Sequence, residues 1–137
     1  MLPLTTAQDH KKILEGEKGL NTGGMGAYTP VPSISSNKMN ELSKTFVEPI
    51  VQHLAEQGIK YQGMFYAGLI LTDKGPNLLE INVRFGDPET QAIIPLLETD
   101  LLELLHASAI GTLNEIKKIK WKNDCLLYTS PSPRDAS

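Results

Sequence analysis

The sequence predicts an α+β fold, built mainly from antiparallel sheet with flanking helices. Apolar residues recur at three- and four-residue steps over residues 37–57, which is typical of an amphipathic helix. Two apolar segments, residues 63–72 and 78–85, lie on either side of a turn-forming sequence and predict a β-hairpin. Residues that favour helix starts follow at Asp87 and Thr99.

The composition limits the class of protein. The chain has 137 residues, of which 40% are hydrophobic, so disordered, collagen-like and disulfide-scaffold classes are excluded. A net charge of −3 gives no general attraction for nucleic acid or an anionic membrane. The single cysteine, Cys125, cannot form an internal disulfide, and no Cys/His cluster indicates zinc. No apolar run approaches the roughly 18 residues of a membrane span, and residues 1–6 show no signal peptide.

The first part of the chain is predicted to be irregular and the next to be a helix. Residues 1–8 predict a short strand and a loop, and residues 15–33, with five glycines and two prolines, predict a loop. The helix over residues 37–57 should be kinked by Pro49 and ended by Gly58. Residues able to cap its start are Ser35, Ser36 and Asn37.

The hairpin is predicted from two different patterns. Residues 63–72 form a continuous apolar run, which suits a strand buried on both faces. Residues 78–85 alternate between two faces. The apolar face holds Leu79, Ile81, Val83 and Phe85, and the polar face holds Glu80, Asn82 and Arg84.

Two further helices are predicted after the hairpin. The first begins at Asp87-Pro88-Glu89, where Asp can cap and Pro suits the first helical position, and it ends near Pro95. The second begins around Thr99-Asp100, runs to about Ile110 and stops at Gly111.

The end of the chain follows no structural pattern. Residues 125–135, CLLYTSPSPRD, resemble the translation of a transposon-end adapter used in sequencing libraries. A natural Ser/Pro-rich linker is the alternative. We expect residues 125–137 not to be native and interpret residues 1–124 without them.

Three polar residues of the hairpin could bind a metal and an anion. On a strand, Glu80, Asn82 and Arg84 lie on one face at steps of about 6.5 Å. Carboxylate and amide oxygens suit Mg²⁺ or Mn²⁺, and an arginine can hold a phosphate or a carboxylate. A solvated polar face of the sheet is the alternative.

Three other motifs could carry chemistry. In Gly86–Thr90 the residues Asp87 and Glu89 could position a substrate amine or accept a proton, although helix capping is the alternative. The glycine-rich segment Asn21–Tyr28 could wrap around an anion or a small substrate, or be a flexible surface loop; it matches neither a P-loop nor a dinucleotide fingerprint. Gln8–Lys11 combines an acceptor, a titratable ring and a cation, and His10 could act as a base or a hydrogen-bond donor. A solvated turn is the alternative.

The order of these motifs resembles one family. LPLTTAQDHKK, GLNTGGMGAYTP, YAGLILT and LLEINVRFGDPETQ occur in succession within residues 2–110, and together they are similar to the glycinamide ribonucleotide synthetases. These are the phosphoribosylamine–glycine ligases of the ATP-grasp superfamily. The resemblance implies the C-terminal half of an ATP-grasp fold, in which two α+β halves clamp ATP. It also implies that glycine and 5-phosphoribosylamine are joined, through a glycyl phosphate, in the second step of de novo purine synthesis.

The resemblance also assigns roles by position. Glu80 and Asn82 would hold Mg²⁺ or Mn²⁺ on the phosphates of ATP, which is a substrate. Catalytic roles fall on Arg84, Asp87 and Glu89. The substrate-binding residues would be Asp9, His10, Lys11, Asn21, Thr22, Gly23, Gly24, Met25 and Gly26.

The resemblance sets expectations for the whole protein as well. Residues 1–110 would be the C-terminal part of the ATP-grasp domain, and residues 111–124 the start of a connection to another domain. Family members are several times longer, so the chain alone is expected to be inactive. The parent protein is expected to be a cytoplasmic monomer that binds ATP, glycine and 5-phosphoribosylamine, with no nucleic-acid or membrane partner.

Two other functions remain open at this point. The chain could belong to another ATP-grasp carboxylate–amine ligase, although NTGGMGAY and FGDPETQ argue against this. It could also be a non-catalytic module that binds a nucleotide or a metal.

Overall fold

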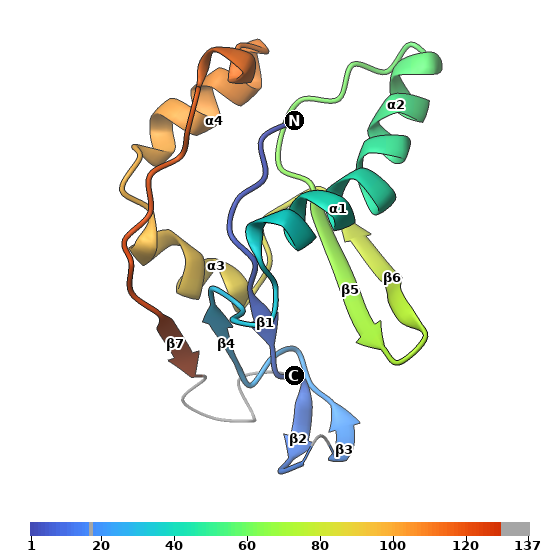
Figure 1. Ribbon diagram of the computed structural model, residues 1–137, viewed down its shortest axis with the longest axis vertical. Helices are drawn as coiled ribbons and strands as arrows, with labels where there is room; N and C mark the ends of the chain where they lie inside the picture. The colour runs from blue at the N-terminus through green and yellow to red at the C-terminus, as the bar shows by residue number, and fades with distance from the viewer. Residues whose placement is uncertain (17, 130–137) are drawn as a thin grey trace. The chain divides into compact units, whose positions relative to one another are not determined.

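The computed structural model describes residues 1–16 and 18–129 (Figure 1). The chain divides into two compact units. Unit 1 consists of Met1–Pro3, Ile34–Phe85 and Asp100–Lys118, and unit 2 consists of Leu4–Ser33, Gly86–Thr99 and the residues from Ile119 onward. Both units combine short helices with strands, and every strand pairing within the described residues is antiparallel. The α+β class predicted from the sequence is therefore confirmed.

Unit 1 opens with two helices where one kinked helix was predicted. Helix α1 covers Ser36–Phe46 and helix α2 covers Glu48–Glu56. The break falls at Val47 because Pro49 lies in the first turn of α2, where its missing N–H is not needed. Ser35 caps α1 as predicted, its hydroxyl oxygen accepting a hydrogen bond from the Lys38 backbone N–H at 3.2 Å.

A β-hairpin follows in the same unit. Strand β5 (Tyr66–Thr72) pairs with strand β6 (Gly75–Asn82). Gly68 pairs with Glu80 and Leu69 pairs with Leu78, so Leu79 has no partner and forms a β-bulge. The strict alternation predicted through Phe85 is therefore wrong, because the bulge interrupts it and the strand ends at Asn82.

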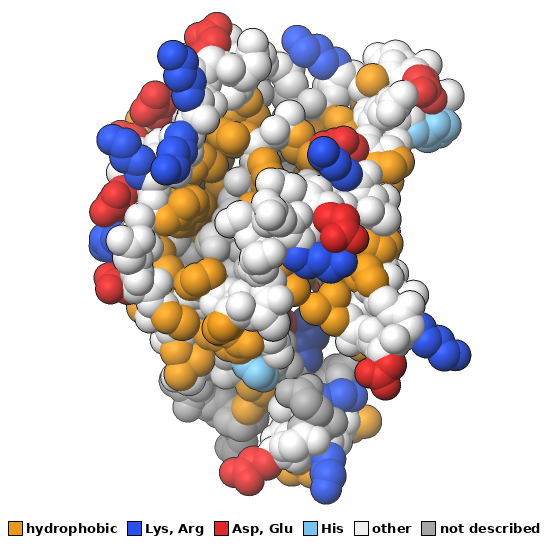
Figure 2. Space-filling view, viewed as in Figure 1, with side chains coloured by type: hydrophobic (Ala, Val, Ile, Leu, Met, Phe, Trp, Pro, Cys, Tyr) orange, Lys and Arg blue, Asp and Glu red, His pale blue; other side chains and the backbone are white. Residues whose placement is uncertain are grey.

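The predicted burial of β5 on both faces is also wrong. Ile70 and Leu71 are 45% and 52% exposed, and on and after β6 Leu79 and Val83 are 67% and 70% exposed. Within the described residues this sheet consists of β5 and β6 alone. Figure 2 shows hydrophobic side chains lying among charged ones at the surface.

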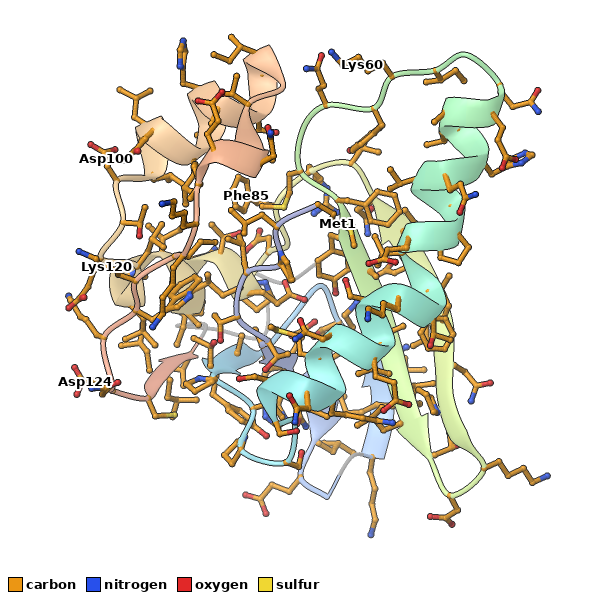
Figure 3. All side chains as sticks on the ribbon, turned by 45° about the horizontal axis from the view of Figure 1, so that its top comes forward. Met1, Lys60, Phe85, Asp100, Lys120 and Asp124 are labelled. Carbon is orange, nitrogen blue, oxygen red and sulfur yellow. The ribbon has the colours of Figure 1, made fainter. Side chains whose placement is uncertain are left out.

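Unit 1 ends with helix α4 (Leu101–Ile110) and a short 3₁₀ turn, Leu113–Glu115. Asp100 lies at the start of α4 (Figure 3), and its carboxylate accepts a hydrogen bond from the Leu102 backbone N–H at 2.8 Å. Gly111 adopts the left-handed conformation with φ +83° and ends the helix. Both boundaries agree with the sequence prediction.

Unit 2 contains a three-stranded sheet in the order β1-β4-β7. Its strands are β1 (Gln8–Asp9), β4 (Gly26–Thr29) and β7 (Leu126–Thr129). Ala27 and Thr29 of β4 are completely buried, and the Thr29 hydroxyl donates a hydrogen bond to the Thr6 carbonyl at 2.7 Å. This central strand forms the core of the unit together with the buried residues Ala92 and Leu96.

The segment predicted as a loop over residues 15–33 is more regular than expected. It contains β4 and also strand β3 (Lys18–Asn21), which pairs with strand β2 (Lys12–Leu14). Glycine content favoured a loop, but pairing within unit 2 supplies the hydrogen bonds that hold these residues as strands.

Helix α3 (Glu89–Ile93) starts differently from the prediction. Pro88 precedes the first helical residue and makes no side-chain cap. The Asp87 carboxylate does not cap the helix either; it accepts a hydrogen bond from the Gln91 side-chain amide at 2.6 Å. The helix continues as a 3₁₀ turn through Ile94–Leu96, so its end near Pro95 agrees with the prediction.

Part of the segment interpreted as non-native is a strand. Asp124 lies just before β7 (Figure 3), and β7 pairs with β4 from Leu126↔Thr29 to Thr129↔Gly26. Residues 130–137 lie outside the described residues. The origin of residues 125–137 stays a prediction.

Within the described residues, the helices are all too short to cross a membrane.

The cap of α4 provides a test of the helix start. Asp100→Ala removes the acceptor for the Leu102 N–H and should lower the free energy of unfolding by about 1 kcal/mol. Asp100→Asn keeps a side-chain oxygen and should cost less. Urea unfolding followed by circular dichroism measures both variants, and equal losses would rule out the capping contact.

The exposed apolar residues of the hairpin should make the chain associate. We expect the 137-residue chain to elute as oligomers in size-exclusion chromatography with light scattering, and Leu79→Lys to reduce this association. Asn77→Lys is the matched control, because it adds the same charge to the exposed part of β6 without removing apolar surface. A sharp monomer peak from the unchanged chain would contradict the prediction.

Candidate functional site

The candidate metal-binding residues lie on one face of the hairpin in unit 1. In the register of the two strands, Glu80 lies opposite Gly68 and Asn82 lies opposite Tyr66. Residues that pair across strands share a face, so these four residues lie together. Glu80 is exposed and Asn82 is half-buried. The pairing places the two predicted oxygen ligands on the same face, as their spacing predicts.

Gly68 makes room for the Glu80 side chain. A Cβ atom placed on Gly68 would lie 2.8 Å from Cγ and 3.3 Å from Oε1 of Glu80. A contact of 2.8 Å is essentially never seen, so a side chain at position 68 would force the Glu80 side chain to move from its place over the strand. The sequence offered one signal for this role, since a glycine within an apolar strand often marks a close approach.

Arg84 does not continue the polar face of β6. The strand ends at Asn82, and Arg84 is exposed in the segment that follows. Its Nη1 atom donates a hydrogen bond to the carbonyl of the next residue, Phe85, at 2.8 Å. The prediction that Glu80, Asn82 and Arg84 share one strand face is therefore wrong for the arginine.

Asp9 is the central polar residue of unit 2. Its side chain is 8% exposed, because β1 pairs Asp9 with the fully buried Ala27 of β4. Within residues 1–16 and 18–129, both carboxylate oxygens lack a hydrogen bond of normal geometry. The Lys11 ammonium forms an ion pair with this carboxylate, its Nζ lying 3.7 Å from Oδ2.

A second carboxylate, Glu89, approaches from α3. Glu89 is the first residue of this helix and is 5% exposed. Burial, and to a smaller extent the Glu89 carboxylate, raises the pKa of Asp9 to about 6, while Lys11 and His10 oppose the rise. The fold thus brings two buried carboxylates near each other. They lie 80 residues apart in the sequence, so their proximity was not predicted.

The glycine-rich segment is tied to the residues that follow β1. The Met25 backbone N–H donates to the His10 carbonyl at 2.7 Å, and the Thr22 N–H donates to the Lys11 carbonyl at 2.7 Å. The Gly24 N–H donates to the Thr22 hydroxyl at 3.2 Å. Two of the predicted substrate-binding segments therefore form one local structure.

Gly24 is the point where three segments of unit 2 meet. It has φ +139°, and a Cβ atom there would lie 2.5 Å from Cδ of Pro88 and 3.2 Å from Oδ1 of Asp9. Only glycine fits both the backbone conformation and the space. The loop, β1 and the residues before α3 converge here, and Pro88 is a member that the sequence reasoning missed.

The remaining predicted residues lie at the edges of these two groups. The His10 ring lies 5.7 Å from the Tyr28 ring, measured between centroids. Asn21 and Gly23 are exposed, Met25 is half-buried, and Gly26 is buried opposite Thr129. Asp87 is exposed, and its carboxylate accepts a hydrogen bond from Gln91.

Comparison with known proteins identifies the family. Residues 1–90 match the family model described as "Phosphoribosylglycinamide synthetase, ATP-grasp (A) domain".

The chain belongs to this family.

Relatives of this ATP-grasp family agree with the match. Phosphoribosylamine–glycine ligase from Rhizobium meliloti (strain 1021) is 50% identical over 127 residues, which is 93% of this chain and 30% of that protein. The trifunctional purine biosynthetic protein adenosine-3 from Drosophila melanogaster is 51% identical over 123 residues, 90% of this chain and 9% of that protein. The crystal structure of the Thermotoga maritima phosphoribosylamine–glycine ligase matches with a TM-score of 0.65 and 36% identity, covering 80% of this chain and 28% of that chain.

The chain spans about 30% of the length of the bacterial ligases that it matches.

The buried Asp9 carboxylate predicts a dependence of stability on pH. Its pKa is raised from 3.8 to about 6 on folding, so the folded state binds the proton more tightly than the unfolded state. Stability should therefore fall as pH rises from about 4 to about 6, and the cost should be fully present above about pH 6.

Asp9→Asn should remove this cost. After allowance for solvent screening, we expect a gain of about 1–2 kcal/mol in unfolding free energy at pH 7 and none below about pH 4. Asp73→Asn, at the exposed hairpin turn, is the control for the loss of one carboxylate charge. Urea unfolding at a series of pH values measures both, and a gain that does not vary with pH would refute the assignment.

Proposed function

We propose that this chain supplies the metal-binding hairpin and part of the substrate pocket of an ATP-dependent ligase that joins glycine to 5-phosphoribosylamine. The product is glycinamide ribonucleotide, in de novo purine biosynthesis. The observation that carries the proposal is that Glu80 and Asn82 lie on one face of β6, within the 90 residues that match the family. The names of the relatives support the same reaction.

The residues of the hairpin fit a hard divalent cation. Glu80 and Asn82 offer a carboxylate and an amide oxygen from adjacent positions of one face, and Gly68 leaves the space into which Glu80 extends. We propose that these two residues hold Mg²⁺ or Mn²⁺ and leave the other coordination positions to phosphate oxygens. When bound, the ion neutralises charge that develops on the phosphates during transfer.

The proposed reaction has two steps. In the first, a carboxylate oxygen of glycine attacks the γ-phosphorus of ATP, the bond to the β-phosphate oxygen breaks, and ADP leaves. In the second, the amine nitrogen of 5-phosphoribosylamine attacks the acyl carbon of the glycyl phosphate. The carbon–oxygen bond breaks, phosphate leaves with the electron pair, and the amine loses a proton as the amide forms.

We propose the following roles for residues of this chain. Arg84, exposed after β6, stabilises negative charge on the phosphoryl group, and Asp87 contacts the substrate at the start of α3. The substrate pocket is formed by Asp9, His10 and Lys11 with the glycine-rich segment, whose backbone hydrogen bonds hold it against them. Glu89 is buried beside Asp9, which favours a binding role over contact with bulk solvent.

The wider expectations belong to the same proposal. Residues 1–110 form the C-terminal half of the ATP-grasp domain, and residues 111–124 begin a connection to a further domain. Residues 125–137 are not native. The whole enzyme acts as a monomer in the cytoplasm on ATP, glycine and 5-phosphoribosylamine.

A chimeric enzyme tests the metal ligands. Residues 1–124 replace the matching segment of the Rhizobium meliloti ligase, and formation of glycinamide ribonucleotide and ADP is measured. Glu80→Ala and Asn82→Ala should each lower kcat/KM by at least about 100-fold, because charge on the phosphates is no longer neutralised. Asn77→Ala, on the same strand, is the matched control and should retain activity.

Other outcomes of this assay would contradict the proposal. Full activity of Glu80→Ala would remove the metal role, and a preference for another carboxylate substrate over glycine would indicate a different ATP-grasp ligase. The 137-residue chain by itself should show no turnover, so measurable activity of the isolated chain would also contradict it.

A further inference from the structure

We propose that Tyr66 is a positioning residue for the metal site, because its ring confines the Glu80 side chain to one place over Gly68. The inference rests on the proposed function and deepens it, since Tyr66 belongs to none of the motifs from which the site was predicted. Tyr66 holds one of the ligands and does not itself contact the ion.

Four residues of the β5–β6 hairpin share one face in unit 1 (Figure 1). The register places Tyr66 opposite Asn82 and Gly68 opposite Glu80. Residues that lie directly opposite each other in an antiparallel pair have their side chains on the same face. The two proposed ligands therefore lie in a row on β6, and Tyr66 and Gly68 lie in a row beside them on β5.

The Tyr66 ring leans along β5 towards Gly68. A Cβ atom placed on Gly68 would lie 3.3 Å from Cε1 of Tyr66 and 2.8 Å from Cγ of Glu80. Two side chains that both reach the space over the same residue lie beside each other there. The ring thus forms a wall at one side of the Glu80 side chain, and the backbone of Gly68 forms the floor beneath it.

This enclosure matters because Glu80 is exposed, whereas Tyr66 is half-buried. An exposed glutamate samples many rotamers, and the entropy lost when such a long side chain is ordered is among the largest for any residue type. A cation that is held by two side chains needs both oxygens in place at once. A wall that already restricts Glu80 reduces the entropy lost on binding, so it raises affinity without adding a ligand.

An aromatic ring suits this task. It is rigid and wide, and only two torsion angles have to be fixed to hold it, so it limits a neighbouring side chain at low entropic cost. Its carbon atoms do not compete with the carboxylate for a hard cation. Glycine at position 68 complements the ring at position 66, because any larger residue there would displace both the ring and Glu80.

The first experiment measures Mn²⁺ binding by the 137-residue chain, without nucleotide or turnover. Electron paramagnetic resonance reports the free ion, and Glu80→Gln defines the part of the binding that depends on this ligand. Tyr66→Leu should weaken that binding by about 10-fold, the loss expected when the ion itself must order one long side chain. Tyr66→Phe keeps the ring and should bind Mn²⁺ as the unchanged chain does.

Phe65→Leu is the matched control. It removes an aromatic ring from the residue just before β5, where the side chain points away from the Tyr66 face, and it should leave Mn²⁺ binding unchanged.

A double variant separates positioning from a loss of stability. Gly68→Ala introduces a Cβ that displaces the Glu80 side chain while the Tyr66 ring is still present, so it tests the same positioning even where Tyr66→Leu fails to fold. If both changes act through Glu80, the two together should weaken Mn²⁺ binding about as much as either one does. Independent damage to the hairpin would instead multiply the two losses.

Three results would overturn the role of Tyr66. They are equal Mn²⁺ affinities of Tyr66→Leu and the unchanged chain, multiplied losses in the double variant, and Mn²⁺ binding that does not depend on Glu80. Absence of any Mn²⁺ binding by the unchanged chain counts with the last of these, because a positioned ligand pair should bind the ion without nucleotide.

The chimeric ligase keeps this inference apart from the proposed function. Tyr66→Leu should raise the Mn²⁺ concentration needed for half-maximal rate by about 10-fold and leave kcat at saturating Mn²⁺ unchanged. A lower kcat at saturating Mn²⁺ would contradict positioning of the metal ligand. A chimera that forms no ADP with glycine would refute the proposed function, and the Mn²⁺ affinities of the 137-residue chain would still decide the role of Tyr66.

Discussion

The close approach of Gly24 to Pro88 is the contact on which unit 2 depends. A single added carbon at Gly24 would lie 2.5 Å from the proline ring, so the glycine-rich segment and the start of α3 can meet only with no side chain at this position. The same Cβ would lie 3.2 Å from Oδ1 of Asp9. One steric condition therefore affects the glycine-rich segment, the residues before α3 and the side chain of Asp9.

The two units differ in how far their carboxylates are exposed. Glu80 lies exposed over Gly68 on the hairpin, where its carboxylate is accessible to solvent. Asp9 lies buried on a paired strand, where its charge is disfavoured and a cation would be held tightly. The same functional group thus lies in two different surroundings, exposed on the hairpin where we propose metal binding and buried beside Lys11 in unit 2.

Local signals predicted the helix boundaries well, and long-range contacts explain most failures. Ser35, Asp100 and Gly111 act as expected because a cap depends only on nearby backbone. The bulge at Leu79 is a property of the pairing between two strands, which alternation within one strand does not reveal. Asp87 has the right identity for a cap, but Gln91 takes its carboxylate instead.

The candidate site was predictable in part. The spacing of Glu80 and Asn82 predicts a shared face because it is a local property of a strand, whereas Arg84 leaves that face once the strand ends. The pairing of Asp9 with Glu89 depends on the tertiary fold, and neither residue type nor spacing indicates it. The resemblance to a family identified most of the candidate site residues, but it did not show which of them lie close together in the fold.

The edge of β4 accepts a partner through backbone atoms alone. Gly26 lies opposite Thr129, and a Cβ there would lie 2.6 Å from the Tyr128 carbonyl, so the partner strand comes unusually close. Hydrogen bonds between peptide groups are indifferent to side-chain identity, and half of the β7 side chains point into solvent. The pairing of β7 with β4 therefore depends on backbone hydrogen bonds more than on the identity of the β7 side chains.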